Sequence, residues 1–311
     1  MEKKIYLLIS LIFLQIVVIG FLSYKIYQNK KNVLGKVSVN TVSRESINFF
    51  PTDNFKGFFE PKPNTTEEIH RDWLSYVPKY TINTDALNER YDYLIKKDGD
   101  VYRIIALGDS YTFGVNISTE KNWTELLEDY LNKNKLCPKI NKYEVINLGV
   151  GGYDTAYEIE RFKLRGIKYN PDLIVWYVTD LYRITDKIQQ LAEKMDIDET
   201  KNQSQGVFYE AWREAREIIM KQYGERGLID YQLSLLKKFR QKDYPNKPLL
   251  FLSAWDELKR LGTNNIYYSN TFVLNDKKYL LPDNHFNDLG HEKFMEELVA
   301  ALEKNKLLPC N

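Results

Sequence analysis

Short apolar runs alternate with amphipathic helical patterns over the C-terminal two thirds of the chain, and this alternation constrains the fold more than any other feature. The strand-like runs are Tyr102–Gly108, Tyr143–Gly149, Pro171–Val178 and Lys247–Trp255. Helical patterns occupy residues 122–133, 154–167 and 290–305, and Asp288 is a suitable N-cap for the last of them. Strands alternating with helices favour a parallel sheet that helices cover on both faces. We therefore predict a three-layer α/β/α domain.

The size and charge of the chain narrow the possible functions. Its 311 residues are enough for one core with extensions. Lys and Arg number 44 against 43 Asp and Glu, so the formal net charge is +1. Proteins that bind nucleic acid usually carry a strong basic excess. We expect no nucleic-acid partner.

The segment from Ile5 to Tyr24 contains no charged residue. As a helix it is long enough to cross roughly 30 Å of hydrocarbon, and lysines on both sides leave its orientation open. A cleaved signal peptide is the alternative, although the run is long for one and Val18 and Gly20 make a weak cleavage site. We predict an uncleaved single-pass membrane anchor within residues 1–31.

The rest of the chain divides into two further parts. Residues 32–100 read as a polar stalk followed by an extended aromatic segment, which we expect to pack on the body rather than to form an exposed binding patch. Residues 101–311 form the predicted α/β domain. A helical insertion at about 186–245 interrupts this domain, as a cover or a lid.

Three polar motifs lie where loops leave the predicted strands. Ser110 follows the first strand in "GDSYTFG", glycines follow the second in "NLGVGGYDT", and an Asp-His pair precedes the last helix in "PDNHFNDLGH". A serine nucleophile needs a base, a carboxylate that orients the base, and N–H groups directed at the developing oxyanion. These motifs contain each of those groups. The glycines do not have the G-x-G-x-x-G spacing of a dinucleotide site.

These motifs resemble those of the SGNH, or GDSL, hydrolase superfamily over roughly Tyr102 to Asn305, outside the insertion. The resemblance implies a flavodoxin-like fold. It implies Ser110 as nucleophile, His285 as general base and Asp283 as the partner of His285. The backbone N–H groups of Ser110 and Gly152 would form two arms of an oxyanion hole. The resemblance implies no metal and no organic cofactor.

The last motif departs from the usual Asp-x-x-His pattern of the family. Asp283 and His285 are separated by one residue, whereas the literal Asp-x-x-His here runs from Asp288 to His291. We favour His285, because the surrounding residues resemble the family block with His285 in the catalytic position. His291 then reads as a histidine that packs within the last helix.

The family's third block normally supplies an Asn after the third strand, and here Thr179 and Asp180 stand in its place. A threonine hydroxyl can donate a hydrogen bond to an oxyanion. We therefore predict Thr179 as the third donor of the oxyanion hole. The alternative is that Thr179 only ends the strand and Asp180 caps the next segment, which leaves two backbone donors.

Cys137 follows the first predicted helix of the domain and Cys310 follows the last. In the flavodoxin-like topology that the resemblance implies, these two helices lie side by side on one face of the sheet. We therefore predict a disulfide between them, with two free thiols as the alternative.

The predicted function is that of an ester hydrolase with an acyl-serine intermediate, acting on a carboxylic or acetyl ester outside the cytosol. Its substrate would be a small-molecule or glycan ester, and its membrane contact would be the N-terminal helix. The catalytic domain would be periplasmic or extracellular. An O-acyltransferase or deacetylase of cell-envelope glycans with the same site is one alternative. A catalytically silent envelope-binding module is another.

Overall fold

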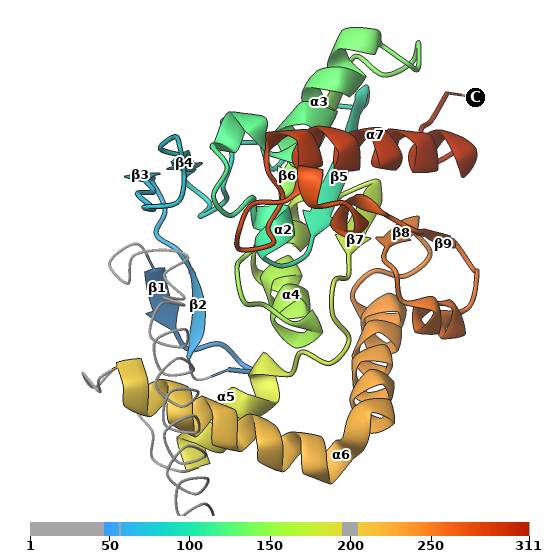
Figure 1. The fold of residues 1–311 in the computed structure, drawn as a ribbon. Coiled ribbons are helices and arrows are strands. Elements are labelled where there is room, and N and C mark those ends of the chain that lie inside the picture. The colour runs from blue at the N-terminus through green and yellow to red at the C-terminus, as the bar shows by residue number, and fades with distance from the viewer. Residues whose placement is uncertain (1–46, 56, 195–204, 311) are drawn as a thin grey trace, which may run out of the picture. The chain divides into compact units, whose positions relative to one another are not determined.

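The computed structural model describes residues 47–55, 57–194 and 205–310. A five-stranded parallel sheet forms its centre, in the order β6-β5-β7-β8-β9 (Figure 1). The strands are β5 Val101–Leu107, β6 Lys142–Asn147, β7 Leu173–Tyr177, β8 Leu249–Leu252 and β9 Ile266–Ser269. The first four confirm the predicted strands. The strand β9 was not predicted, because it is a half-buried edge strand of four residues whose pattern is too short to stand out.

Helices cover both faces of this sheet because its strands are apolar on both sides. In β5, Ile104 and Ala106 contribute to one core cluster and Ile105 and Leu107 to another, and all four are fully buried. Successive side chains of a strand point to opposite faces, so a strand buried throughout needs cover on both. The predicted arrangement of helices around a parallel sheet is confirmed.

Two pairs of helices supply this cover (Figure 1). On one face, α3 (Trp123–Asn134) packs beside α7 (Asp288–Lys304). On the other, α4 (Thr155–Arg161) packs against α6 (Gln205–Lys242). The described residues also form two shorter α-helices, α2 (Ser110–Phe113) and α5 (Thr185–Lys194).

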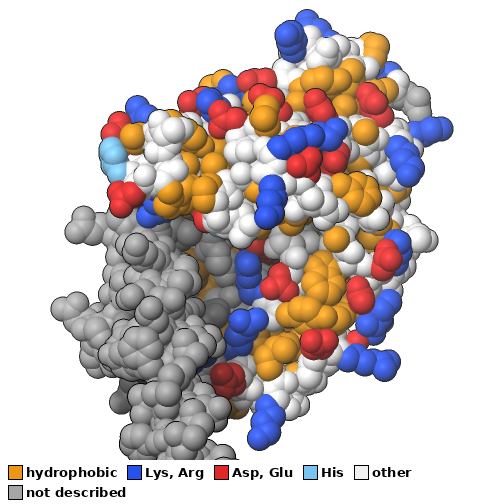
Figure 2. Space-filling view, in the orientation of Figure 1, with side chains coloured by type: hydrophobic (Ala, Val, Ile, Leu, Met, Phe, Trp, Pro, Cys, Tyr) orange, Lys and Arg blue, Asp and Glu red, His pale blue; other side chains and the backbone are white. Residues whose placement is uncertain are grey.

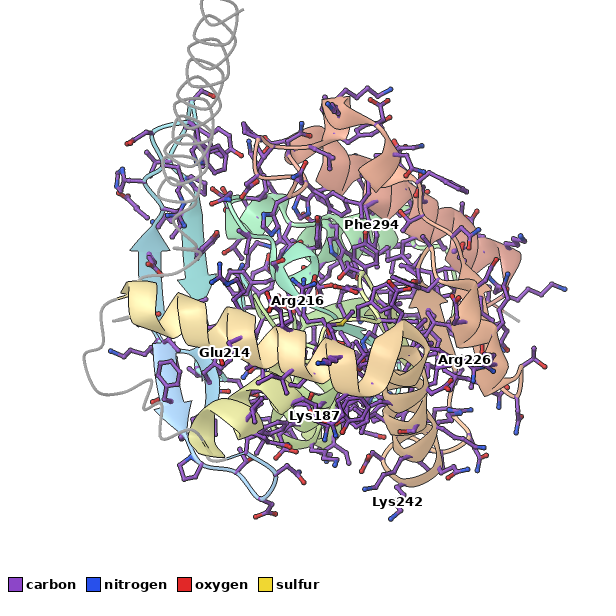
Figure 3. All side chains as sticks on the ribbon, turned by 60° about the horizontal axis from the view of Figure 1, so that its bottom comes forward. Lys187, Glu214, Arg216, Arg226, Lys242 and Phe294 are labelled. Carbon is purple, nitrogen blue, oxygen red and sulfur yellow. A yellow bond between two sulfur atoms is a disulfide. The ribbon has the colours of Figure 1, made fainter. Side chains whose placement is uncertain are left out.

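The predicted insertion contains two parts with different packing, and the boundary between them lies within α6. Gly224 has φ 62° and ψ 169°, so the backbone turns there and α6 is two helices joined at an angle (Figure 3). The half after Gly224 covers the sheet through Leu233, Leu236 and Phe239. The half before it packs against α5 and the residue that precedes α5, with Ala215 and Ile219 in one cluster with Ile188 and Ile184. Part of the insertion is thus a core helix of the domain.

The segment before the sheet forms two hairpins, β1 (Ile47–Phe50) with β2 (Phe58–Pro61) and β3 (Thr65–Glu68) with β4 (Lys79–Ile82). Phe58 is fully buried, and its ring centroid lies 5.6 Å from those of Tyr153 and Tyr157. The aromatic residues of this segment therefore pack beside the loop that carries the glycine motif.

Charged side chains of both signs are interspersed on the face drawn in Figure 2. A few pairs are buried instead. Glu60 in β2 pairs with Arg161 in α4, and neither side chain is more than 1% exposed. This buried pair is a second attachment of the N-terminal segment to the sheet domain.

Cys137 and Cys310 form a disulfide, which confirms the predicted pairing. Cys137 lies just after α3 and Cys310 just after α7. The bond joins the chain beyond the ends of two helices that already pack together.

The predicted anchor, residues 5–24, lies outside the described residues, as does the stalk up to residue 46. Within the described ranges, no helix has both the length and the apolar character needed to span a bilayer.

Candidate active site

Ser110 is the first residue of α2, and only Gly108 and Asp109 separate it from the carboxyl end of β5. The turn between them requires glycine at position 108, which has φ 154°. A Cβ atom there would lie 2.2 Å from Oγ1 of Thr112 and 3.0 Å from the carbonyl oxygen of Tyr177. Only a residue without a side chain fits that contact. This tight strand-to-helix turn places Ser110, 7% exposed, at the edge of the sheet.

His285 and Asp283 form a continuous hydrogen-bonded chain with Ser110. Nε2 of His285 lies 2.9 Å from Oγ of Ser110, and Nδ1 of His285 lies 2.9 Å from Oδ2 of Asp283. The structure thus brings together the three residues that we predicted, from positions 175 residues apart along the chain. Their geometry is that of a nucleophile, a base and an orienting carboxylate.

The Asp-x-His spacing works because the backbone turns sharply between the two residues. Asn284 has φ 67°, and its N–H donates to the carbonyl of Leu281 at 2.9 Å. The N–H of His285 donates to Oδ1 of Asp283 at 3.2 Å. Asp283 therefore holds both the backbone and the ring of His285.

Burial acts to raise the pKa of Asp283, but the hydrogen bonds and the charge interaction with His285 together outweigh it and hold that pKa below its usual value. The carboxyl group is therefore ionised over the neutral pH range. An ionised Asp283 accepts the proton on Nδ1, which leaves Nε2 with a lone pair directed at Ser110.

Tyr111 also contributes to the site, and sequence analysis did not single it out. Its hydroxyl donates to the carbonyl of Asn284 at 3.0 Å, and its ring centroid lies 5.1 Å from that of His285. Its position directly after the serine is the only sequence feature that could have indicated this contact. Tyr111 holds the turn that carries the histidine.

His291 lies apart from this chain of hydrogen bonds. It is 1% exposed, and its Nδ1 accepts the N–H of Trp123 at 3.1 Å. Burial, with the nearby His285, lowers the pKa of His291 to about 3. It is therefore neutral at physiological pH and packs in the core.

Asp288 has a different place from the one predicted. The N-cap of α7 is Asn287, whose side chain accepts the N–H of Gly290 at 2.9 Å. Asp288 is already the first helical residue, and it pairs with Lys121. The prediction of Asp288 as the cap was wrong by one residue, because either side chain suits a cap and the backbone decides which one takes it.

The glycine motif lies beside Ser110. A Cβ atom added to Gly151 would lie 3.8 Å from Cβ of Ser110, whereas one added to Gly152 would meet nothing within 4 Å. Gly152 has φ 85°, a conformation that favours glycine. Within the described chain, the N–H groups of Ser110 and Gly152 make no hydrogen bond. Both are free to bind an external acceptor.

Thr179 does not point its hydroxyl proton at an oxyanion site. Its Oγ1 donates to Oδ2 of Asp109 at 2.7 Å, and a hydroxyl has one proton to give. With its proton engaged in this way, the arrangement favours the alternative of two backbone donors, and the role of Thr179 as a third donor stays a prediction. Asp109 is 1% exposed. A buried carboxylate accepts hydrogen bonds from nearby donors, because burial without them costs much free energy.

Arg183 is a further residue that sequence analysis missed. Its Nη1 donates to Oδ2 of Asp109 at 2.7 Å and to the carbonyl of Tyr153 at 3.1 Å. It therefore joins the residue before Ser110 to the residue after Gly152. An arginine six residues beyond the end of β7 carries no local pattern that would reveal this role.

In the ranges that the structure covers, no group of three or more His, Cys, Asp or Glu side chains could hold a metal ion.

No protein-family model matches the chain, and no curated protein matches it. Among solved structures, a psychrotrophic esterase EstA from Pseudoalteromonas sp. is 13% identical, over 66% of this chain and 98% of that one, with a TM-score of 0.42. A two-domain esterase active on acetylated mannans is 17% identical, over 68% of this chain and 51% of that one, with a TM-score of 0.43. An acetyl xylan esterase is 16% identical, over 64% of this chain and 99% of that one, with a TM-score of 0.40. At TM-scores below 0.5 these likenesses are too distant to assign an activity to this chain.

Proposed function

We propose that the protein is a serine hydrolase that cleaves carboxylic esters through an acyl-Ser110 intermediate. The observation that carries this proposal is the unbroken chain from Ser110 Oγ to His285 to Asp283, with both contacts at 2.9 Å. Hydrogen-bond contact between a hydroxyl, an imidazole and an ionised carboxylate is the arrangement that activates a serine.

In the proposed reaction, Oγ of Ser110 attacks the ester carbonyl while Nε2 of His285 accepts its proton. Collapse of the tetrahedral intermediate breaks the bond to the alcohol, which leaves with the proton from Nε2. A water molecule then attacks the acyl-enzyme, again with His285 as base, and the acid is released. Asp283 keeps the proton of the neutral imidazole on Nδ1 and stabilises the imidazolium in both halves.

The oxyanion would bind the N–H groups of Ser110 and Gly152. Both groups lack another acceptor within the described chain, and the glycine loop lies against the serine. Donors already in place before the reaction stabilise the developing charge without reorganisation. Because Thr179 is engaged with Asp109, the proposed hole consists of backbone donors.

We also propose that the catalytic domain works outside the cytosol, held by residues 5–24 as a membrane anchor. The disulfide between Cys137 and Cys310 supports an oxidising compartment, since disulfides are rare in reducing cytosol. The uncharged run of those residues supports the anchor.

The test is covalent labelling by a fluorophosphonate, together with hydrolysis of p-nitrophenyl esters of increasing chain length and of acetylated sugars. Ser110→Ala should abolish labelling, and Ser110→Ala and His285→Ala should each lower ester turnover by about a thousandfold or more. Ser234→Ala and His70→Ala, at exposed positions, are the matched controls and should behave as wild type.

A wild-type protein that is folded but neither labels nor hydrolyses any of these esters would contradict the proposed function and favour a binding module. Activity that survives His285→Ala but not His291→Ala would contradict the choice of base.

A further inference from the structure

Asn116 lies beside the candidate triad but outside every motif discussed above. It follows α2 and the turn at Gly114, and it is 2% exposed. Its N–H donates to the hydroxyl of Tyr80 at 2.6 Å, and its carbonyl accepts the hydroxyl of Tyr76 at 3.0 Å. Its φ of 64° is in the left-handed region. The backbone of Asn116 is thus held on both sides by the segment around β4.

The side chain of Asn116 contacts the triad carboxylate. Its Nδ2 donates to Oδ2 of Asp283 at 2.7 Å, and this is the same oxygen that Nδ1 of His285 meets at 2.9 Å. The amide orientation follows from the chemistry, because the flipped group would direct its oxygen at a carboxylate.

We propose that Asn116 is a positioning residue, which fixes the rotation of the Asp283 carboxylate so that Oδ2 stays in line with His285. This inference rests on the proposed function. A carboxylate turns easily about the bond that joins it to the side chain, and two donors to one oxygen remove that freedom. The Asp283 side chain is 30% exposed, so water competes with the two hydrogen bonds that it accepts from His285, one of which is a long contact of 3.2 Å from the backbone N–H to Oδ1.

Through Asn116, the N-terminal segment also has a part in catalysis. Tyr76 and Tyr80 hold Asn116, and Asn116 holds Asp283, which is 167 residues further along the chain. Residues before the sheet domain thereby determine the geometry of a site built from the domain's own loops.

The experiment is a double-mutant cycle between Asn116 and Asp283, read as the rate of fluorophosphonate labelling of Ser110 and as kcat and KM on one p-nitrophenyl ester. Asn116→Gly removes the side chain and tolerates the positive φ. In the wild-type background it should lower kcat by about tenfold to a hundredfold, the range of one hydrogen bond to a charged group, with little change in KM. In an Asp283→Asn background it should have almost no further effect.

Asn246→Gly is the matched control, because Asn246 is exposed and has φ 60°. It should leave kcat unchanged. Asn116→Asp is a second variant that keeps the shape and, when ionised, replaces the donor with an acceptor. It should also be slow, and its effect should also vanish without the Asp283 carboxylate.

Equal losses in both backgrounds would overturn the inference, since they would show that Asn116 acts independently of Asp283. Full activity of folded Asn116→Gly would overturn it as well. Failure of the wild type to label would instead overturn the proposed function, so the two failures are distinguishable.

Discussion

Asp109 organises the site at the scale of single residues. Its Oδ1 accepts the N–H of Tyr111 at 3.1 Å, while its Oδ2 accepts Thr179 Oγ1 and Arg183 Nη1 at 2.7 Å each. A buried carboxylate with three donors has no freedom to turn, and the residue that follows it is Ser110. The position of the proposed nucleophile therefore depends on a network that takes no part in bond making.

This network makes Thr179→Val a discriminating substitution. We expect it to destabilise the fold by about 1 to 2 kcal/mol, because one donor to a buried charge is lost. Turnover should fall by less than tenfold, whereas loss of an oxyanion donor costs about a hundredfold or more. Urea unfolding and ester kinetics measure the two effects.

Thr271→Val is the matched control for this substitution. The Thr271 hydroxyl also donates to a carboxylate, at 2.8 Å from Glu297, outside the candidate site. If turnover fell by a hundredfold or more in Thr179→Val but not in Thr271→Val, Thr179 would be an oxyanion donor after all.

At the scale of elements, the bend in α6 depends on one glycine. Gly224 has φ 62°, yet a Cβ atom there would meet nothing within 4 Å. Any cost of a side chain at this position is therefore a backbone cost. Gly227, one turn later, has helical backbone angles and space for a methyl group, with its nearest neighbour at 3.4 Å.

We expect opposite effects at these two glycines. Gly224→Ala should lower the free energy of unfolding by about 1 to 3 kcal/mol, the range for a residue forced into that conformation. Gly227→Ala should raise it by up to about 1 kcal/mol through helix propensity. Urea denaturation of both variants tests this, and equal shifts of the same sign would show that the bend does not depend on Gly224.

Asp154 joins two elements through a buried carboxyl group. It caps α4 by accepting the N–H groups of Ala156 and Tyr157, and it accepts the N–H of Asp186 at 2.9 Å. Burial, followed by the proximity of Asp186, raises the pKa of Asp154 to about 8. The folded protein therefore holds a proton on Asp154 at pH values where the unfolded chain has released it.

A raised carboxyl pKa makes stability fall as the pH rises, here between about 4 and 8. Asp154→Asn keeps a capping oxygen and removes the titration. Relative to wild type, we expect this variant to gain about 1 kcal/mol or more in unfolding free energy between pH 5 and pH 8. Urea unfolding at several pH values measures the difference.

Asp256→Asn, at a side chain that is 77% exposed, is the matched control for the pH series. Its stability curve should run parallel to that of wild type. A parallel curve for Asp154→Asn as well would contradict the raised pKa.

At the scale of the whole molecule, the disulfide ties the two helices of one face at positions 173 residues apart. Closing a loop of that length in the unfolded chain stabilises the folded state by about 5 kcal/mol in the chain-entropy model. Cys310 is exposed, whereas Cys137 is fully buried. Cys310→Ser thus opens the loop without leaving a cavity.

We expect Cys310→Ser to unfold at much lower urea concentration than the oxidised wild type, with a loss approaching about 5 kcal/mol. Ester turnover below the unfolding transition should be unchanged. Reductant should destabilise the wild type to a similar degree and leave Cys310→Ser unaffected. Equal stability of the oxidised wild type and the variant would show that the bond contributes little.

The sequence by itself determined the parts that depend on local pattern. Short apolar runs such as 102–108 predict strands that are buried on both faces, and the helical patterns between them favour a parallel sheet. The resemblance in its motifs selected Ser110, His285 and Asp283, which the structure brings into contact. The sequence did not determine whether Asn287 or Asp288 caps α7, because both side chains can cap a helix.

Only the tertiary structure decided which groups share a buried charge. Thr179 and Arg183 converge on Asp109, and Asn116 reaches Asp283, across separations of 70, 74 and 167 residues. No periodicity encodes such contacts, because each depends on where the folded backbone places a carboxylate and on which donors lie within 3 Å of it. Local patterns in the sequence thus predict four of the five central strands and the motifs of the triad, whereas the residues that support the triad are decided by which donors reach a buried carboxylate.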